Sequence, residues 1–240
     1  MLLTTKLADK YIGIESPSTE LRDFFKDYLV ENHSPDFIVS CTEQDVMAEQ
    51  DITDASFPYH YLETLAILRK ISELFPSQNR LLIHGAAISY HEKAYLFTAP
   101  SGTGKSTHIC LWRKYLGQEV QIVNGDKPFV SLDSEQTYIY GTPWAGKENW
   151  QRNCQVPLNG ICFLQRGTTN SIRQLSPMEA LPLLMRQVYL SKTSETVAQT
   201  LGLVDTLMQK VPLYLLKCDM SEEAVRCSFE KMTGEIYSRL

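Results

Sequence analysis

The sequence lacks long apolar runs. No stretch approaches the roughly 20 apolar residues that a membrane-spanning helix needs. Residues 1–6 show no basic segment leading into an apolar core, as a signal peptide would. The six cysteines are scattered, and no two have the C-x-x-C spacing of a zinc or redox motif. We therefore expect a cytoplasmic protein with reduced thiols and no membrane partner.

The chain also lacks an excess of positive charge. It carries 23 Lys and Arg against 28 Asp and Glu, a net charge of −5. Because a domain-wide basic excess marks nucleic-acid binders, we expect no nucleic-acid partner, although a local basic pocket remains compatible with this average. The 240 residues are 43% apolar and 21% charged, which is ordinary for a soluble globular protein and excludes a disordered or fibrous one.

Hydrophobic periodicity predicts helices and strands in two groups. In the first group, helices over 21–30 and 58–75 flank a short strand at 36–41. In the second, strands dominate the middle and helices the end of the chain. The strands are predicted at 81–89, 93–98, 119–123, 128–132, 137–141, 157–165 and 211–217, and the helices from 105 to about 116, at 177–190, at 193–209 and at 221–232. The pattern predicts an α/β fold with a mixed, partly antiparallel sheet flanked by helices.

A phosphate-binding pattern lies between one of these strands and a helix. Residues 99–106, APSGTGKS, fit the P-loop, with Ala99 where the first glycine usually stands. Gly102 and Gly104 let the backbone fold into a tight loop whose N–H groups face phosphate oxygens, and the helix that follows adds the positive end of its dipole. Such a pattern arises by chance in only about 2% of chains of this length. The alternative is a glycine-rich turn that merely caps a helix.

Each residue of the loop has an expected role. Lys105 would hold the outer phosphates, and the Ser106 hydroxyl can ligate Mg²⁺. We therefore expect ATP and Mg²⁺ as cofactors. The predicted nucleotide contacts are Ser101, Gly102, Thr103, Gly104, Lys105, Ser106 and Thr107.

A nucleotide-bound metal needs a carboxylate near the end of a strand. Asp126 follows the apolar run 119–123, so it should lie where ligands gather in α/β sheets, as a metal ligand or as a proton acceptor. A plain Gly-Asp turn is the alternative. His84 lies inside an apolar strand pattern, where a histidine is more often packed in the core than catalytic.

Cations and tryptophans surround a further glycine-rich stretch, residues 141–146. Lys127, Lys147 and Arg152 can pair with phosphates or can remain solvated surface charges. Trp144 and Trp150 can form an aromatic wall, but burial in the core is the simpler interpretation.

Taken together, these motifs resemble the HPr kinase/phosphorylase family, which shares its nucleotide-binding core with phosphoenolpyruvate carboxykinase. The resemblance covers about residues 80–170 and is closest to the short HPr-kinase-like proteins, several of which accompany peptide-modification genes. It rests on IHG (83–85), SGTGKS (101–106), NGD (124–126), GTPWAGKENWQRN (141–153) and VPLNGICFLQRG (156–167). It implies a P-loop reached from an antiparallel strand pair. It also implies a site in which His84 lies near the transferred phosphate, Lys105 and Ser106 bind phosphate and metal, and Asp126 serves as metal ligand and base.

The sequence departs from the family in two places. HPr kinase has two adjacent aspartates where this chain has Gly125 and Asp126, so one carboxylate must serve both roles. The signature that follows the core in HPr kinase is absent after residue 170, so neither HPr as substrate nor the reverse reaction carries over. We divide the chain into an N-terminal α/β subdomain of unknown role, 1–79, and an HPr-kinase-like P-loop domain with C-terminal helices, 80–240.

Three functions are consistent with the sequence. The first is an ATP- and Mg²⁺-dependent kinase that transfers the γ-phosphoryl group to a hydroxyl. The expected acceptor is a serine of a peptide or protein, or a small hydroxyl compound. Asp126, His84 and Lys105 would be the catalytic residues, and Ser106 and Asp126 the metal ligands. The second is a nucleotide-binding accessory or sensor protein, and the third is a simple ATPase. The sequence leaves open whether the chain forms a homo-oligomer.

Overall fold

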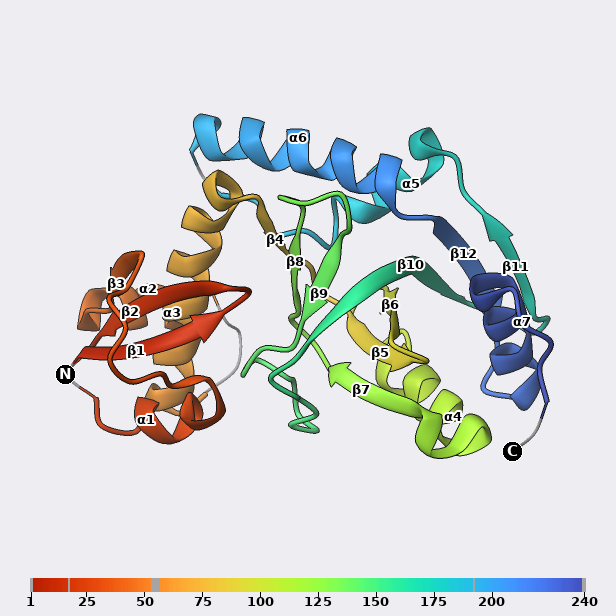
Figure 1. Cartoon of the computed structure of the whole chain (residues 1–240), viewed down its shortest axis with the longest axis horizontal. Coiled ribbons are helices and arrows are strands. Elements are labelled where there is room, and N and C mark those ends of the chain that lie inside the picture. Colours follow the sequence, from red (N-terminus) through yellow and green to blue (C-terminus); the bar gives the residue numbers. More distant parts are fainter. Residues whose placement is uncertain (1, 17, 53–56, 192, 239–240) are drawn as a thin grey trace.

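The computed structural model describes residues 2–16, 18–52, 57–191 and 193–238. These residues form a three-stranded sheet near the N-terminus and a nine-stranded sheet in the rest of the chain, with helices packed around both (Figure 1). Each sheet combines parallel and antiparallel strand pairs. The prediction of a mixed α/β protein with a mixed sheet is therefore confirmed.

The small sheet has the strand order β1-β2-β3 and packs against two helices. Its elements are β1 (Leu2–Leu7), β2 (Lys10–Glu15), β3 (Phe37–Ser40), α2 (Glu43–Ile52) and α3 (Tyr59–Leu74). The predicted strand at 36–41 and helix at 58–75 are confirmed. The β1-β2 hairpin was not predicted, because its turn uses Ala8 and Asp9 at φ of 48° and 59° instead of the Asn-Gly pair that usually marks such a turn.

The predicted helix over 21–30 is wrong beyond its first turn. The structure has a short helix, α1 (Leu21–Phe24), followed by a single 3-10 turn over Lys26–Tyr28. Leu29 is extended and bridges to Thr5 of β1, and Val30 N donates to Thr4 O at 3.0 Å. The exposed edge of β1 thus takes the backbone bonds that a longer helix would have used.

The large sheet runs in the order β4-β8-β9-β10-β6-β5-β7, with β12 beside β10 and β11 beside β12. Its strands are β4 (Arg80–Leu82), β5 (Ala86–Tyr90), β6 (Lys93–Thr98), β7 (Val120–Asn124), β8 (Phe129–Ser131), β9 (Tyr138–Tyr140), β10 (Gln155–Arg166), β11 (Ser171–Gln174) and β12 (Leu213–Cys218). The strand β10 holds the sheet together, because it pairs antiparallel with β9 at its start and parallel with β6 and β12 further on. Apart from β11, each of these strands lies at a predicted position, although β4 and β5 were predicted as a single strand.

The single strand predicted over 81–89 is wrong, because two strands, β4 and β5, occupy this stretch. They lie far apart in the strand order, and residues 83–85 cross between them. The crossing residues bond elsewhere: Ile83 bridges to Val188, and His84 N donates to Gln187 O at 2.7 Å. Gly85 N donates to Asp126 O at 2.8 Å. The crossing therefore brings His84 and Asp126 to the same place.

Helices cover both faces of the large sheet. They are α4 (Lys105–Leu116), α5 (Pro177–Leu184), α6 (Ser194–Lys210) and α7 (Glu222–Thr233). Along β6 the side chains alternate: Leu96 packs in the cluster with α5 and α6, whereas Tyr95 and Phe97 pack with α4 and α7. The helix predicted over 177–190 ends early, at Leu184, because Tyr189 N donates to Leu82 O at 3.0 Å and holds this segment against β4.

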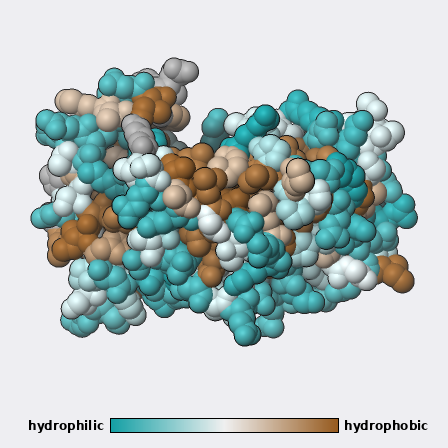
Figure 2. All heavy atoms as spheres, turned by 90° about the horizontal axis from the view of Figure 1, so that it is seen from above, coloured by the Kyte–Doolittle hydropathy of each residue, from teal (hydrophilic) through white to brown (hydrophobic). Residues whose placement is uncertain are grey.

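The face seen from above in Figure 2 is the side on which α6 lies, and apolar side chains gather across its middle. On α3, α5 and α6, the leucines Leu74, Leu181 and Leu201 keep 41%, 39% and 45% of their surface exposed. Among the residues that the structure describes, no helix has the length and apolarity that a membrane span requires.

Candidate functional site

A glycine-rich loop, residues 99–104, joins β6 to α4. Gly102 and Gly104 have φ of 76° and 120°, and a Cβ at either would meet no atom within 4 Å. The backbone conformation, and not crowding, is therefore what requires glycine there. The loop is tied to the end of β10, since Arg166 donates to the carbonyl oxygens of Gly102 and Thr103.

The first turn of α4 offers free backbone donors to the cleft beside this loop. The earliest backbone bond of the helix runs from His108 N to Gly104 O at 2.9 Å. The N–H groups of residues 105–107 precede it and have no carbonyl of the helix as a partner. Together with the helix dipole, these groups make the start of α4 attractive to an anion.

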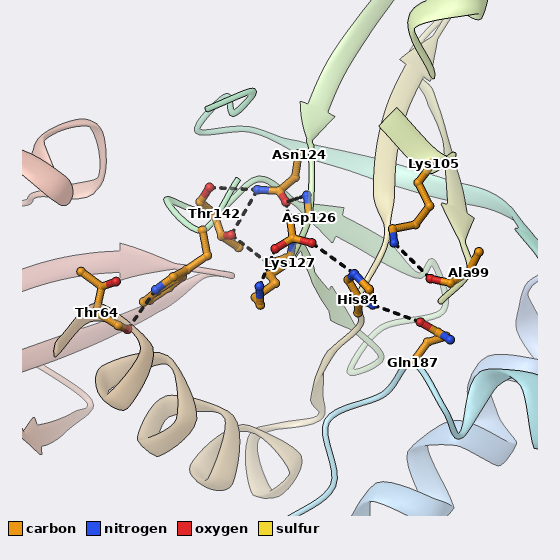
Figure 3. Close-up of polar contacts among 10 residues, drawn as sticks. Thr64, His84, Ala99, Lys105, Asn124, Asp126, Lys127, Thr142 and Gln187 are labelled. Atoms are coloured by element: carbon orange, nitrogen blue, oxygen red, sulfur yellow. Dashed lines mark hydrogen bonds and ion pairs between the residues drawn. The ribbon is translucent and has the colours of Figure 1, made fainter. Parts of the chain in front are cut away.

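Lys105 is buried although it carries a charge. Its side chain is only 8% exposed, and Nζ donates to the neutral carbonyl of Ala99 at 3.0 Å (Figure 3). Among the described residues it forms no ion pair. Burial lowers the pKa of the Lys105 ammonium below its usual range, an effect that the nearby Asp126 carboxylate partly offsets. A buried ammonium of this kind is poorly compensated until an anion binds beside it.

Asp126 is held in place by the end of β7. Asn124 is fully buried, and its Oδ1 accepts the N–H groups of Asp126 and Lys127 at 2.9 and 2.8 Å. Its Nδ2 in turn donates to Thr142 O at 2.9 Å. This Asn turn fixes the backbone that carries Asp126, so the position of the carboxylate does not depend on flexible side-chain contacts alone.

The Asp126 carboxylate has two cationic or potentially cationic neighbours. His84 Nε2 lies 3.3 Å from Oδ1, and Lys127 Nζ forms an ion pair with Oδ2. Burial raises the pKa of the Asp126 carboxyl, but the hydrogen bond from His84 and the charge of Lys127 outweigh burial and lower this pKa to about 2. Asp126 is therefore fully ionised near neutral pH.

His84 lies between Asp126 and Gln187, as Figure 3 shows. Its Nδ1 is 3.1 Å from Gln187 Oε1, so the two ring nitrogens face two different partners. The amide of Gln187 can turn either its oxygen or its nitrogen toward Nδ1. These two contacts fix the orientation of the His84 ring.

A cleft of about 710 Å³ lies over these groups. Of the residues predicted from the sequence, it brings together His84, Ser101, Gly102, Gly104, Lys105, Ser106, Thr107 and Asp126. Thr103 faces a neighbouring pocket of about 470 Å³, which adjoins the cleft along the glycine-rich loop. Lys147 lines the cleft, but Arg152 lies outside it and donates to Gln121. Trp144 is only 3% exposed, which agrees with the interpretation that it is a core residue.

Two residues of this site escaped the sequence reasoning. Gln187 falls in a stretch predicted to be helix, and Arg166 lies directly after the predicted strand 157–165, inside the stretch 156–167 that resembles the family, but neither was assigned a role. Gln187 is 7% exposed and bonds His84 of the crossing through its backbone carbonyl and its side chain. For Arg166 a signal was available, because a cation that follows the apolar run 161–164 lies at the end of a buried strand, where ligands gather in α/β sheets.

Gly125 shows why this site has one carboxylate and not two. A Cβ on Gly125 would lie 2.5 Å from the Ala145 carbonyl oxygen, so the backbone of the 143–146 segment leaves no room for a side chain. We expect Gly125→Ala to lower the free energy of unfolding by about 1–3 kcal/mol. The matched change Gly202→Ala, on the exposed surface of α6 where a Cβ meets nothing, should raise it by about 0.5–1 kcal/mol. Urea unfolding measures both, and equal effects of the two changes would refute this explanation.

The low pKa of Asp126 predicts a pH dependence of stability. The carboxyl titrates at about 2 in the folded protein, against an ordinary value of 3.8. Its ionised form therefore contributes stability above pH 3.8, about 2 kcal/mol in size, which is lost as the pH falls toward 2. Urea unfolding of the wild type and of Asp126→Asn between about pH 5 and pH 2.5 isolates this contribution. The difference between the two proteins should shrink on acidification; a constant difference would contradict the assignment.

Comparisons with known proteins add a distant likeness. No protein-family model matches the chain, and no curated protein matches it. Among solved structures, the chain is similar to the HPr(Ser) kinase/phosphatase from Coxiella burnetii, with a TM-score of 0.36 and 14% sequence identity. The similarity covers 64% of this chain and 99% of that chain. A TM-score below 0.5 at this identity does not assign a family or an activity.

Proposed function

We propose that the protein is an ATP- and Mg²⁺-dependent phosphotransferase that moves the γ-phosphoryl group of ATP to a hydroxyl. The observation that carries the proposal is Lys105, a buried ammonium with a neutral partner that shares one cleft with the ionised Asp126. A phosphate chain supplies the negative charge that Lys105 lacks, and a carboxylate opposite supplies what a metal or an acceptor hydroxyl needs.

In this proposal the glycine-rich loop acts as a P-loop. The phosphates lie against the N–H groups at the start of α4 and beside Lys105. The nucleoside extends past Gly102 and Gly104 into the adjoining pocket of about 470 Å³, whose walls include Leu111 and Leu164. The apolar side chains suit the face of a purine ring.

The residues present suit a Mg²⁺ ion. Mg²⁺ is usually held by one or two protein oxygens together with phosphates and waters. The Ser106 hydroxyl has no hydrogen-bond partner among the described residues and lines the cleft with the ionised Asp126, so a hydroxyl oxygen and a carboxylate face the same space. When bound, the ion neutralises charge on the phosphates.

Transfer then proceeds by direct displacement at the γ-phosphorus. The acceptor oxygen forms a bond to the γ-phosphorus, the bond from that phosphorus to the β–γ bridging oxygen breaks, and ADP leaves with the electron pair. The hydroxyl proton is taken up by the pair of Asp126 and His84, whose facing atoms lie 3.3 Å apart. Because phosphoryl transfer depends mainly on positioning and charge neutralisation, one carboxylate in the site suffices.

The test measures transfer of label from γ-labelled ATP to L-serine or to a short peptide with an internal serine. Each reaction is run once with Mg²⁺ and once with excess chelator. The proposal expects a labelled phosphate ester that requires Mg²⁺. Label that appears only as inorganic phosphate would overturn the proposal in favour of an ATPase.

A second candidate is a nucleotide-binding sensor or accessory protein. The observation that favours it is the double pairing of Asp126, whose two oxygens already face His84 and Lys127. Under this alternative ATP binds and is recovered unchanged, with no label on any acceptor.

A further inference from the structure

A second, smaller pocket opens next to Asp126 on the side of the N-terminal elements. It has a volume of about 200 Å³. Leu21 and Phe24 of α1 and Trp144 form its apolar wall, and Asp126 and Lys127 line the same pocket. The pocket therefore lies between residues on both sides of the boundary at 79.

This pocket and the large cleft share part of their lining. Tyr61, Asp126, Gly146 and Asn149 belong to both. Asp126 thus faces two spaces at once, one beside the glycine-rich loop and Lys105, the other beside the N-terminal elements. A group in the small pocket reaches the carboxylate from the side of the N-terminal elements.

The wall of the small pocket is built by specific contacts between the two parts of the chain. Trp144 Nε1 donates to Thr64 O of α3 at 2.9 Å, and the Phe24 and Trp144 rings meet edge to face with centroids 5.7 Å apart. Both contacts join the N-terminal elements to the segment that follows β9. Thr64, Phe24 and Trp144, which make these contacts, all line the pocket.

We infer that this pocket binds the phosphoryl acceptor, and that the acceptor enters it as a single hydroxyl-bearing residue of the size of serine. The inference rests on the proposed function. Pockets for drug-sized ligands usually measure about 300–1,000 Å³, so 200 Å³ suits one residue or a small molecule. The apolar wall contacts the body of that residue, and its hydroxyl lies at the Asp126 end.

Two sources present this chemistry: free L-serine and a serine within a peptide. His60 and Glu20 line the small pocket, and their side chains are 58% and 69% exposed and lie 3.6 Å apart as a surface pair. This pair is in contact with solvent, so both sources are compatible with the pocket. Separate titrations with L-serine and with the short serine peptide distinguish them.

The experiment compares two phenylalanines of the same N-terminal core. Phe24 and Phe37 are both partly buried against this core, but only Phe24 lines the pocket. Phe24→Ala should raise the KM for the acceptor about tenfold, with kcat and the Kd for ATP within about twofold of wild type. Phe37→Ala, the matched control, should leave the KM for the acceptor unchanged. Phe24→Trp, which fills the pocket and keeps an aromatic ring, should raise that KM without loss of thermal stability.

The outcomes separate this inference from the proposed function. If wild type labels an acceptor and both Phe24 variants keep its KM, or if Phe37→Ala raises it equally, the pocket is not the acceptor site and the proposed function stands. If wild type labels no acceptor, calorimetric binding of L-serine and of the peptide in the presence of ADP decides. Binding that the Phe24 variants abolish and Phe37→Ala preserves keeps the pocket but overturns the kinase, and no binding overturns both.

Discussion

Replacing Lys105 by alanine is expected to lower phosphoryl transfer by about 10³-fold or more, with the fold intact. The ammonium is buried and, among the residues that the structure describes, bonds only the Ala99 carbonyl, so the folded protein without nucleotide gains little from the charge. The bound phosphates gain most from it, and more so as charge develops during transfer. The free energy of unfolding should therefore change by no more than about 1 kcal/mol.

The control for this change lies on the same helix. Lys114→Ala removes an exposed lysine of α4 that contacts the ring of Tyr115 and no part of the cleft. It should leave transfer unchanged. Rates of labelled ester formation, with urea unfolding of both variants, make the comparison. Near-normal transfer by Lys105→Ala would remove the basis of the proposed function.

Replacing Asp126 by asparagine is expected to lower transfer by about 10³–10⁴-fold. The change keeps the size of the side chain and leaves the backbone bonds to Asn124 in place. It removes the charge that would hold a metal and attract the acceptor proton. The Kd for ATP should rise only a few-fold, because the loop, the start of α4 and Lys105 remain.

An exposed aspartate serves as the matched control. Asp205 lies on α6 and does not line the cleft, and it accepts a hydrogen bond from Gln209 at 2.8 Å. Asp205→Asn should change neither transfer nor ATP affinity. If Asp126→Asn transferred phosphate at the wild-type rate, the carboxylate would have no chemical role, and the pairing with His84 and Lys127 would be structural.

The local part of this site could be predicted from the sequence, and the long-range part could not. Residues 101–107 are contiguous, so their motif alone predicted a glycine-rich loop between β6 and α4. Asp126 was identified because it follows the apolar run of β7. By contrast, His84 reaches the site through a crossing that the apolar pattern of 81–89 conceals. Strand breaks made by bonds to residues more than 40 positions away, here Gln187 and Asp126, leave no trace in local periodicity.

The same distinction explains the other differences. The interior helices and strands follow from periodicity because each buries a regular face, as Leu96 and Phe97 do on opposite sides of β6. The helices predicted at 21–30 and 177–190 end early because the residues that follow them form backbone hydrogen bonds with the strands β1 and β4. Likewise, Gly125 carries no local sign that the Ala145 carbonyl approaches it.

The central claim, that the cleft transfers phosphate to a hydroxyl, is tested most directly by following the γ-phosphoryl group through one turnover. Enzyme in excess over γ-labelled ATP is mixed with Mg²⁺ and L-serine or the serine peptide, and the products are separated at successive times. The account predicts that label passes from ATP to the acceptor as a phosphate ester in step with ADP formation. Label that remains in ATP, or that passes only to water, would contradict it.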